Sequence, residues 1–409
     1  MKCRHCNAEL VTTLVDLGSA PPSNAYLTTQ TLHSAEKWFP LRVLVCTECW
    51  LVQTEDFAGA AGLFDADYAY FSSFSTTWLA HAERYVAEMT GRFRLDAKSH
   101  VVEVAANDGY LLQYFRQRGI PCLGVEPTTG TAAVARGKGI PVIEEFFGVK
   151  LARGLAAQGG QTDLAVANNV LAHVPDINDF VAGFSVLLKP GGVATFEFPH
   201  LMRLMAGNQF DTIYHEHFSY LSLQAVNRIF ESNGLTVFDV EELPTHGGSL
   251  RIFAQRKSTG THATTFRVEE LMKREAVAGV TTTGYYSDFQ SRADKVKNDL
   301  LAFLIEAKEA GKRVGGYGAA AKGNTLLNYA GVRPDLLPWV VDRNPAKQDK
   351  FMPGNRIPIV AETRLHKDRP EFVVILPWNL REEVMTQLAY IREWGGRFVT
   401  AVPRLEVCR

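Results

Sequence analysis

The sequence contains no run of apolar residues long enough to cross a bilayer, and its first residues lack the apolar stretch of a signal peptide. We therefore expect a cytoplasmic protein that does not enter a membrane. The chain also lacks an excess of either charge, because its formal net charge is −1. A basic surface for a polyanion is not expected, which argues against nucleic acid as a partner.

Cysteine is scarce, and four of the six cysteines form two pairs with the same spacing: Cys3 with Cys6, and Cys46 with Cys49. In a cytoplasmic chain, thiols are better interpreted as metal ligands than as disulfides, and four thiolates at this spacing suit tetrahedral zinc. Such a site has no open position for water or substrate. We therefore expect structural Zn²⁺ that holds together a module too small to fold alone. His5 is an alternative ligand, whereas Cys122 and Cys408 lack ligand spacing.

The length of 409 residues is too great for a single core, and 46% hydrophobic residues are enough for several. We expect three domains. A zinc-binding module occupies 1–70, a central α/β domain 71–257, and a C-terminal Rossmann-like α/β domain 258–409. The last boundary lies at a short polar stretch that contains glycine.

The central domain is short of glycine where a nucleotide-binding loop is expected. The apolar strand 101–104 runs into a tight loop and a helix start. The loop keeps only Gly109, with Ala105 and Asn107 at the two other positions where such loops usually carry glycine. A dinucleotide dehydrogenase needs glycine there so that the backbone can touch a pyrophosphate. A cofactor without a phosphate therefore fits this loop better.

Three further strands follow in the order of a parallel sheet. Strand 122–125 ends in Glu126, whose carboxylate we expect to accept hydrogen bonds from both hydroxyls of a ribose. Strand 164–167 ends in Asn168, and strand 193–197 follows a Pro-Gly-Gly turn. This order resembles the class I S-adenosylmethionine-dependent methyltransferases.

A helix at 224–233 and an antiparallel pair of strands at 236–240 and 250–254 would complete the seven-stranded sheet of that class. On this interpretation six residues hold the methyl donor: Glu103, Ala105, Asn107, Gly109, Glu126 and Asn168. The alternative is a plain doubly wound α/β domain with another role.

Acid–base groups are concentrated in four consecutive residues: Tyr214, His215, Glu216 and His217. Burying a phenol, two imidazoles and a carboxylate is costly unless they pair, so this run predicts an active-site segment rather than a solvated loop. A metal site is the alternative, because the two histidines resemble a ligand pair, but no third ligand is evident.

Three residues elsewhere are candidates for the same site. Tyr68 lies in an aromatic cluster at 63–75, and either it reaches the site or the cluster only packs. His173 follows the strand that ends at Asn168, at the end where α/β sheets bind ligands. His246 stands on a Gly-Gly turn, where it either borders the pocket or is a plain turn residue.

The C-terminal domain begins with a second candidate loop. Residues 313–327 contain a strand, a turn of small residues and a helix start. The exposed N–H groups of such a turn, together with Lys322, suit an anionic phosphate. The alternative is a purely structural turn.

Taken together, the chain resembles the C-methyltransferases of unusual deoxysugar biosynthesis, which methylate C-3 of a thymidine diphosphate (dTDP)-linked keto sugar. The motifs that carry this resemblance are the two Cys-x-x-Cys pairs, Val-Glu-Val-Ala-Ala-Asn-Asp-Gly at 102–109, Tyr-His-Glu-His-Phe-Ser-Tyr at 214–220, His-Gly-Gly-Ser-Leu-Arg at 246–251 and Gly-Tyr-Gly-Ala-Ala-Ala-Lys-Gly-Asn at 316–324. The resemblance implies that Ala105 and Asn107 are the family's own form of the loop. It also implies a 3-amino-4-keto sugar of the tetronitrose or kijanose type (dTDP-3-amino-2,3,6-trideoxy-4-keto-glucose), with the 3-keto sugar that leads to mycarose as the alternative.

Methylation at carbon requires removal of a proton next to a carbonyl group, and histidine titrates close to working pH. We therefore expect His217 to be the base, Tyr214 to lie near the developing oxyanion and Glu216 to orient or polarise the site, as the resemblance also implies. Tyr68 and His173 complete the expected catalytic set. The sugar nucleotide's diphosphate is assigned to Gly318, Lys322 and Asn324, and we expect a monomer.

Two other classes of function remain open from the sequence. A small-molecule O- or N-methyltransferase would need neither the acid–base run nor a third domain. A zinc-containing interaction scaffold that has kept an inactive methyltransferase fold would bind no donor.

Overall fold

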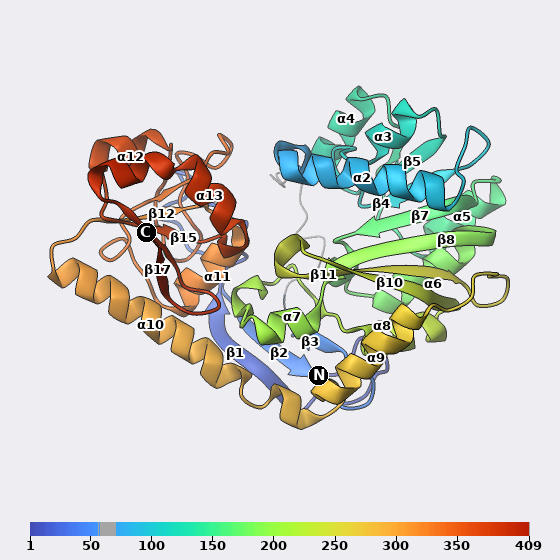
Figure 1. The fold of residues 1–409 in the computed structure, drawn as a ribbon, viewed down its shortest axis with the longest axis horizontal. Helices are drawn as coiled ribbons and strands as arrows, with labels where there is room; N and C mark the ends of the chain where they lie inside the picture. Colours follow the sequence, from blue (N-terminus) through green and yellow to red (C-terminus); the bar gives the residue numbers. More distant parts are fainter. Residues whose placement is uncertain (56, 58–70, 409) are drawn as a thin grey trace.

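The structure is a computed structural model that describes residues 1–55, 57 and 71–408. These residues form three sheets, which Figure 1 shows as an N-terminal sheet below two larger α/β regions. The N-terminal sheet has the strand order β1-β2-β3-β9, the central one β10-β11-β8-β7-β4-β5-β6, and the C-terminal one β14-β13-β12-β15-β16-β17. Among the described helices, none has the length and apolar character needed to span a bilayer.

The central sheet confirms the predicted seven-stranded arrangement. Its strands are β4 (Val101–Val104), β5 (Cys122–Val125), β6 (Val142–Ile143), β7 (Thr162–Asn168), β8 (Leu188–Pro199), β10 (Leu235–Leu243) and β11 (Ser249–Arg256). β4 to β8 run parallel, and β11 is antiparallel to both β8 and β10. The edge strand β6 has only two residues and was not expected from the sequence, because so short a run carries no periodicity.

Helices cover both faces of this sheet (Figure 1). They are α2 (Thr76–Arg92), α3 (Leu112–Gln117), α4 (Thr129–Gly137), α5 (Val149–Ala157), α6 (Ile177–Leu187), α8 (Leu223–Ser232) and α9 (Phe266–Ala278). The short α7 (Leu201–Ala206) packs instead into the core that joins the N-terminal sheet to the C-terminal region. Ser75 and Ser222 cap α2 and α8, since each hydroxyl accepts a backbone N–H of the first turn. α9 packs on β10 and α8. The domain boundaries at residues 70 and 257 stay predictions.

The C-terminal sheet is reached through the long helix α10 (Phe289–Glu309). Its strands are β12 (Val314–Tyr317), β13 (Val340–Val341), β14 (Ile359–Val360), β15 (Phe372–Ile375), β16 (Arg397–Thr400) and β17 (Glu406–Cys408), and its helices are α11 (Ala321–Tyr329), α12 (Thr363–Asp368) and α13 (Arg381–Gln387). The pairs from β14 to β16 are parallel and β17 is antiparallel, so the predicted second α/β domain is confirmed.

Short 3₁₀ helices carry several of the connections. They are η1 (Ser72–Phe74), η2 (Leu171–His173), η3 (Phe210–Thr212), η4 (Thr245–Gly247), η5 (Thr283–Tyr286), η6 (Trp378–Leu380) and η7 (Ala389–Trp394). η2, η3 and η4 all lie close to the predicted site residues in the sequence.

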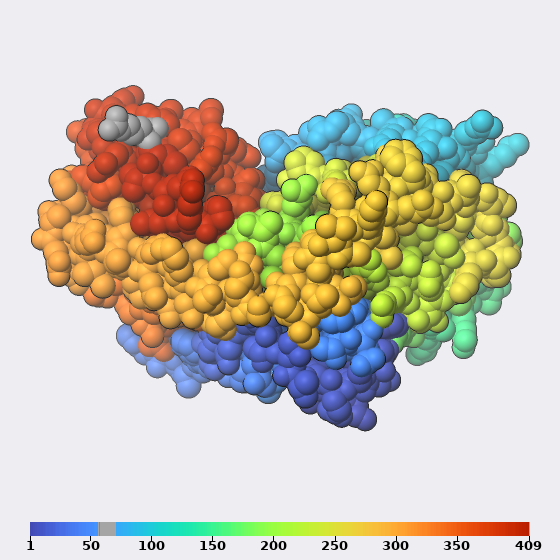
Figure 2. Space-filling model, turned by 60° about the horizontal axis from the view of Figure 1, so that its bottom comes forward, coloured from blue at the N-terminus to red at the C-terminus, as the bar shows by residue number. Residues whose placement is uncertain are grey.

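The N-terminal sheet is built from β1 (Thr12–Ala20), β2 (Phe39–Val45), β3 (Val52–Thr54) and a fourth strand from far along the chain, β9 (Ser219–Tyr220). Successive side chains of β2 point to opposite faces: Val43 and Val45 pack with the C-terminal region, while Leu44 and the following Cys46 pack with the central sheet. Figure 2 shows these N-terminal residues, in blue, running beneath both larger regions. The N-terminal sheet is therefore a layer shared by two cores.

Candidate active site

The loop after β4 has the backbone path of a glycine-rich loop although two of the glycines are absent. Ala105, Asn107 and Gly109 have φ values of 58°, 48° and 74°, all in the left-handed region. Asparagine tolerates this conformation, but for alanine it costs energy, so the surrounding structure must hold it. One such contact is the hydrogen bond from the Ala106 N–H to the Val125 carbonyl, at 3.2 Å.

Glu126 ties this loop to the end of β5. One carboxylate oxygen accepts the N–H of Asn107 at 2.9 Å, and the other accepts the N–H of Thr128 at 2.9 Å and its hydroxyl. Only 4% of Glu126 is exposed. The carboxylate is thus fixed beside the loop, at the carboxyl end of the strand, where the sequence predicted a ribose contact.

Two buried polar side chains lie at the ends of the neighbouring strands. Burial raises the pKa of Glu103 well above its usual value, although a hydrogen bond from Tyr110 opposes the rise. The amide nitrogen and oxygen of Asn168 are both buried without a hydrogen-bond partner among the described residues. Unpaired buried polar groups are costly, so a ligand with an amino group and hydroxyls fits here. These observations match S-adenosylmethionine as the bound group.

His217 is held as a neutral base. Its Nδ1–H donates to the Thr212 carbonyl at 2.8 Å, and because a carbonyl only accepts, Nε2 is the basic nitrogen. Burial lowers the pKa of His217 well below its ordinary value, and His173 lowers it further. The His217 ring lies 3.9 Å from the Tyr214 ring and 4.6 Å from the His173 ring, centroid to centroid. The structure therefore brings these three predicted residues together.

Glu216 and His215 point towards the N-terminal layer. The Asn24 side-chain amide donates to both Glu216 oxygens, at 2.8 and 3.0 Å, and burial raises the pKa of Glu216 to about 7. Nε2 of His215 lies 3.2 Å from the Pro40 carbonyl oxygen, and its ring contacts Phe39 edge-on. His215 is thus engaged with backbone, which leaves the histidine-pair metal site without support in the described part of the chain.

Two more histidines border the same space. Burial lowers the pKa of His173 to about 4, although a hydrogen bond between its ring and the Glu216 backbone opposes this fall. His246 has a left-handed φ of 55° and lies 5.2 Å from the Trp78 ring, and burial lowers its pKa to about 4. The left-handed backbone and the half-buried side chain favour a pocket position for His246. Tyr68 lies outside the described residues.

Lys322 enters the site from the C-terminal domain, in the first turn of α11. Its Nζ donates to the Asn379 side chain at 2.8 Å and lies 4.9 Å from the centre of the Trp378 ring. Burial lowers the pKa of Lys322, which Asp211 partly offsets, and the lysine charge in turn lowers the pKa of His217. Lys322 and the histidines therefore face one another across the two domains.

The other two residues predicted to bind the sugar nucleotide have packing roles in this structure. Gly318 has a φ of 87°, and a Cβ there would lie 2.5 Å from the Pro377 ring. Asn324 is 1% exposed and its side-chain oxygen accepts a hydrogen bond from Asn355 at 3.3 Å. Neither observation tests a ligand contact, so both assignments stay predictions.

The four paired cysteines come together as one cluster. The ligand atoms of Cys3, Cys6, Cys46 and Cys49 all lie within 4.8 Å of one another. Four thiols at this separation fit the tetrahedral coordination of zinc, and no oxygen or nitrogen ligand is needed. Gln53 donates to the Cys3 sulfur at 3.2 Å, which connects the cluster to β3.

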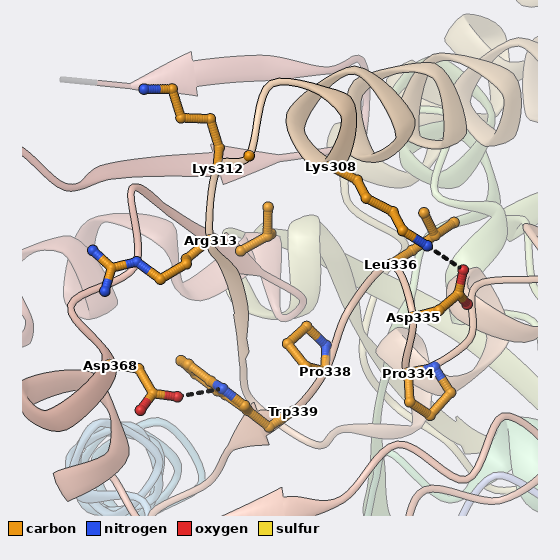
Figure 3. A pocket seen from close by; sticks show the side chains of 11 residues that line it. Lys308, Lys312, Arg313, Pro334, Asp335, Leu336, Pro338, Trp339 and Asp368 are labelled. Atoms are coloured by element: carbon orange, nitrogen blue, oxygen red, sulfur yellow. Dashed lines mark hydrogen bonds and ion pairs between the residues drawn. The ribbon is translucent and has the colours of Figure 1, made fainter.

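A separate surface pocket lies at the other end of the C-terminal sheet (Figure 3). It has a volume of about 330 Å³ and is lined by residues that precede β12 and β13, among them Lys312, Arg313 and Trp339. Ligands of open α/β sheets bind at the carboxyl ends of the strands, and Lys322 and the histidines lie on that side. The pocket is therefore not part of the candidate site.

Sequence reasoning missed the residues that hold the acid–base run in place. Glu216 accepts a hydrogen bond from Asn24. His217 is held by two threonines, Thr54 and Thr212. Only Thr212 is close in the sequence. Asn24 and Thr54 lie 192 and 163 residues from their partners, so no local pattern could reveal them.

Comparisons with known proteins cover almost the whole chain. Family models described as "Putative zinc binding domain", "Methyltransferase domain" and "C-methyltransferase C-terminal domain" match residues 3–64, 78–240 and 244–403. C-methyltransferase NovU of Streptomyces niveus is 33% identical over 406 residues, which cover 99% of this chain and 96% of NovU.

Two further similarities are confined to part of the chain. Ubiquinone biosynthesis O-methyltransferase of Bordetella avium (strain 197N) is 31% identical over 98 residues, or 24% of this chain and 41% of that protein. The solved structure of magnesium protoporphyrin IX methyltransferase from Synechocystis PCC 6803 with bound S-adenosylmethionine has a TM-score of 0.34 and 15% identity, and covers 44% of this chain and 79% of that one.

Proposed function

The chain belongs to the family of S-adenosylmethionine-dependent C-methyltransferases with a zinc-binding N-terminal domain, and from this we propose that it methylates C-3 of a dTDP-linked keto deoxysugar. The sugar we propose is dTDP-3-amino-2,3,6-trideoxy-4-keto-glucose. The observation that carries the proposal is the His217 imidazole, whose Nδ1–H is held by the Thr212 carbonyl and whose ring lies 3.9 Å from the Tyr214 ring, centroid to centroid.

The reaction begins with proton removal from carbon. Nε2 of His217 takes the proton from C-3, and the electrons of the C–H bond pass to the neighbouring carbonyl as an enolate. The Tyr214 hydroxyl donates to the enolate oxygen. Bound S-adenosylmethionine supplies an electrophilic methyl group on sulfur. Held by the loop after β4, the donor would pass this methyl group to C-3, with a C–C bond formed, the C–S bond broken and S-adenosylhomocysteine as the leaving group.

The remaining predicted residues bind and orient the two reactants. We assign the donor to the loop after β4 and its surroundings: Glu103, Ala105, Asn107, Gly109, Glu126 and Asn168. Glu216 orients the sugar, and His173 and Tyr68 border it. Gly318, Lys322 and Asn324 contact the diphosphate, which places the reacting sugar between the two α/β domains.

Product analysis tests this proposal. The purified protein is incubated with S-adenosylmethionine carrying a ¹³C-methyl group and a panel of dTDP-linked sugars that includes 3-amino-4-keto and 3-keto forms. We expect the label on C-3 in the NMR spectrum of the 3-amino-4-keto product. A labelled methyl group on oxygen or nitrogen, or no transfer to any keto sugar, would contradict the proposal.

A further inference from the structure

The N-terminal layer holds three of the four acid–base residues. Nε2 of His215 lies against the backbone carbonyls of Phe39 and Pro40, Asn24 donates to Glu216, and the Thr54 hydroxyl donates to the His217 carbonyl at 3.0 Å. Directly after this run, β9 pairs with β3. The segment is therefore positioned by residues that come from another part of the chain.

The contact at Glu216 differs from the other two because it joins two side chains rather than a side chain and a backbone carbonyl. The Asn24 nitrogen lies 2.8 Å from one carboxylate oxygen and 3.0 Å from the other. Glu216 is 3% exposed, so water contributes little to its solvation. A donor placed between both oxygens fixes the plane of the carboxylate and favours its ionised form.

The titratable groups around Glu216 in the described part of the chain are three histidines and the Tyr26 phenol, and Lys347 lies on the Tyr26 ring, with Nζ 5.4 Å from its centre. His215 and His217 flank it in the chain, and His173 bonds to its backbone; burial lowers the pKa of all three. Tyr26 faces it from the N-terminal layer, and burial raises the pKa of that phenol. The Asn24 hydrogen bond is thus what offsets the burial of Glu216, whose pKa still rises to about 7.

We propose that Asn24 is a positioning residue for the methyl-transfer reaction: its side-chain amide holds the Glu216 carboxylate in the orientation that contacts the substrate. This inference rests on the role of Glu216 in the proposed function. It adds a task for the N-terminal module that the zinc cluster alone does not explain.

The same segment is fastened to the C-terminal domain. The Tyr26 hydroxyl donates to the Ala319 carbonyl at 2.7 Å, and Leu27 exchanges two backbone hydrogen bonds with Phe351, at 3.0 and 2.8 Å. Tyr26, two residues after Asn24, therefore ties this segment to the loop that precedes α11. Its amide keeps a fixed place relative to both domains.

The test is the pH dependence of turnover in Asn24→Ala, with whichever keto sugar the unmodified protein methylates. Loss of the amide raises the pKa of Glu216, so the fall of kcat on the acidic side should move up by about one pH unit. At pH 6.5 we expect kcat to fall about 10-fold, with recovery to within about twofold at pH 9. Asn24→Asp keeps the size of the side chain and should give a larger shift, because two carboxylates then compete.

Matched variants separate this role from packing. Gln30→Ala changes an exposed residue of the same segment and should keep the original pH profile. In a Glu216→Gln background, Asn24→Ala should add no further shift, because the group it acts on no longer titrates. A uniform loss of kcat at all pH values, or loss of S-adenosylhomocysteine binding in both Asn24 variants, would make Asn24 a packing residue and overturn the proposal.

A second measurement does not depend on the substrate. Infrared difference spectra against Glu216→Gln report the titration of the Glu216 carboxyl group, which we expect near pH 7 in the unmodified protein and about one unit higher in Asn24→Ala. An unchanged titration would refute the positioning role even if the sugar assignment is right. A shifted titration with no sugar methylated would refute the sugar assignment alone.

Discussion

The loop after β4 and the loop after β12 are built alike, although the two α/β domains share no motif. The N–H of Asn107 donates to Glu126, and the N–H of Ala319 donates to Asp342, each at 2.9 Å. In both cases the acidic residue follows the neighbouring strand, and its other oxygen accepts the N–H two residues further on, at 2.9 and 2.8 Å.

The surroundings of the two carboxylates differ in charge. Glu126 lies near the buried Glu103, and the amide of Asn168, two strands away at the end of β7, has no hydrogen-bond partner among the described residues. Beside Asp342, Nζ of Lys347 is 3.9 Å away and donates to the Ala319 carbonyl at 2.9 Å. The two loops share one backbone arrangement but suit different ligands. The loop after β4 suits a ligand with an amino group and hydroxyls, and the loop after β12 suits an anion. Four experiments test this contrast.

Zinc removal should have the largest effect, because the N-terminal sheet packs against both domains. Structural zinc contributes about 10 kcal/mol to the folding of small modules. We expect chelation to lower the Tm of the whole protein by more than about 10 °C, measured by calorimetry with the zinc content followed in parallel. An unchanged Tm after complete loss of zinc would show that the two domains do not depend on the layer between them.

His217→Asn should remove turnover while leaving both loops able to bind. A lost general base lowers kcat by about 10²- to 10⁴-fold. Asparagine retains a donor for the Thr212 carbonyl, so the affinity for S-adenosylhomocysteine should stay within about twofold of the original in calorimetry. Turnover near the original level would remove His217 from the mechanism.

Glu126→Gln compared with Asp342→Asn addresses the contrast directly. Each change keeps the size of the side chain but replaces an acceptor oxygen with a donor. We expect Glu126→Gln to weaken S-adenosylhomocysteine binding by about 10- to 100-fold, since one or two hydrogen bonds to a charged group are lost. Asp342→Asn should leave it unchanged. Equal effects of the two variants would mean that the loops are not specialised.

Lys322→Met should have the smallest effect, confined to the second loop. Removing one charge from an anion site should raise KM for the sugar nucleotide about 5- to 10-fold, with donor affinity unchanged. The pKa of Lys322 is lowered by burial, so in the unmodified protein KM should begin to rise at a lower alkaline pH than for an exposed lysine. A KM that is flat with pH and unchanged in the variant would remove Lys322 from the binding site.

Much of the fold could be predicted because its signals are local. The strands ending at Glu126 and Asn168, the cysteine pairs and the acid–base run are all visible within a few residues. The left-handed backbone of Ala105 was not predictable in the same way: the sequence indicates only that glycine is missing, whereas tertiary contacts decide the conformation.

The rest depends on contacts between distant residues. Asn24 lies after a pair of prolines and carries no pattern of its own, yet it meets Glu216. Lys322 was predicted to bind phosphate, and only the packing of the domains brings it to the histidines. Tyr68 lies outside the described residues and stays a prediction.

The pairing of β3 with β9 also has a consequence for the order in which the protein is made. Thr54 bonds to His217, which lies 163 residues further along the chain. At about 5 to 20 residues per second, a ribosome needs roughly 10 to 30 s to synthesise the residues between them. During this time the outer edge of the nascent N-terminal sheet is unpaired, and such edges attract other strands. Only after residues 219–220 have been made can β9 cover that edge, and the adjoining contact from Thr54 then fixes the backbone of His217.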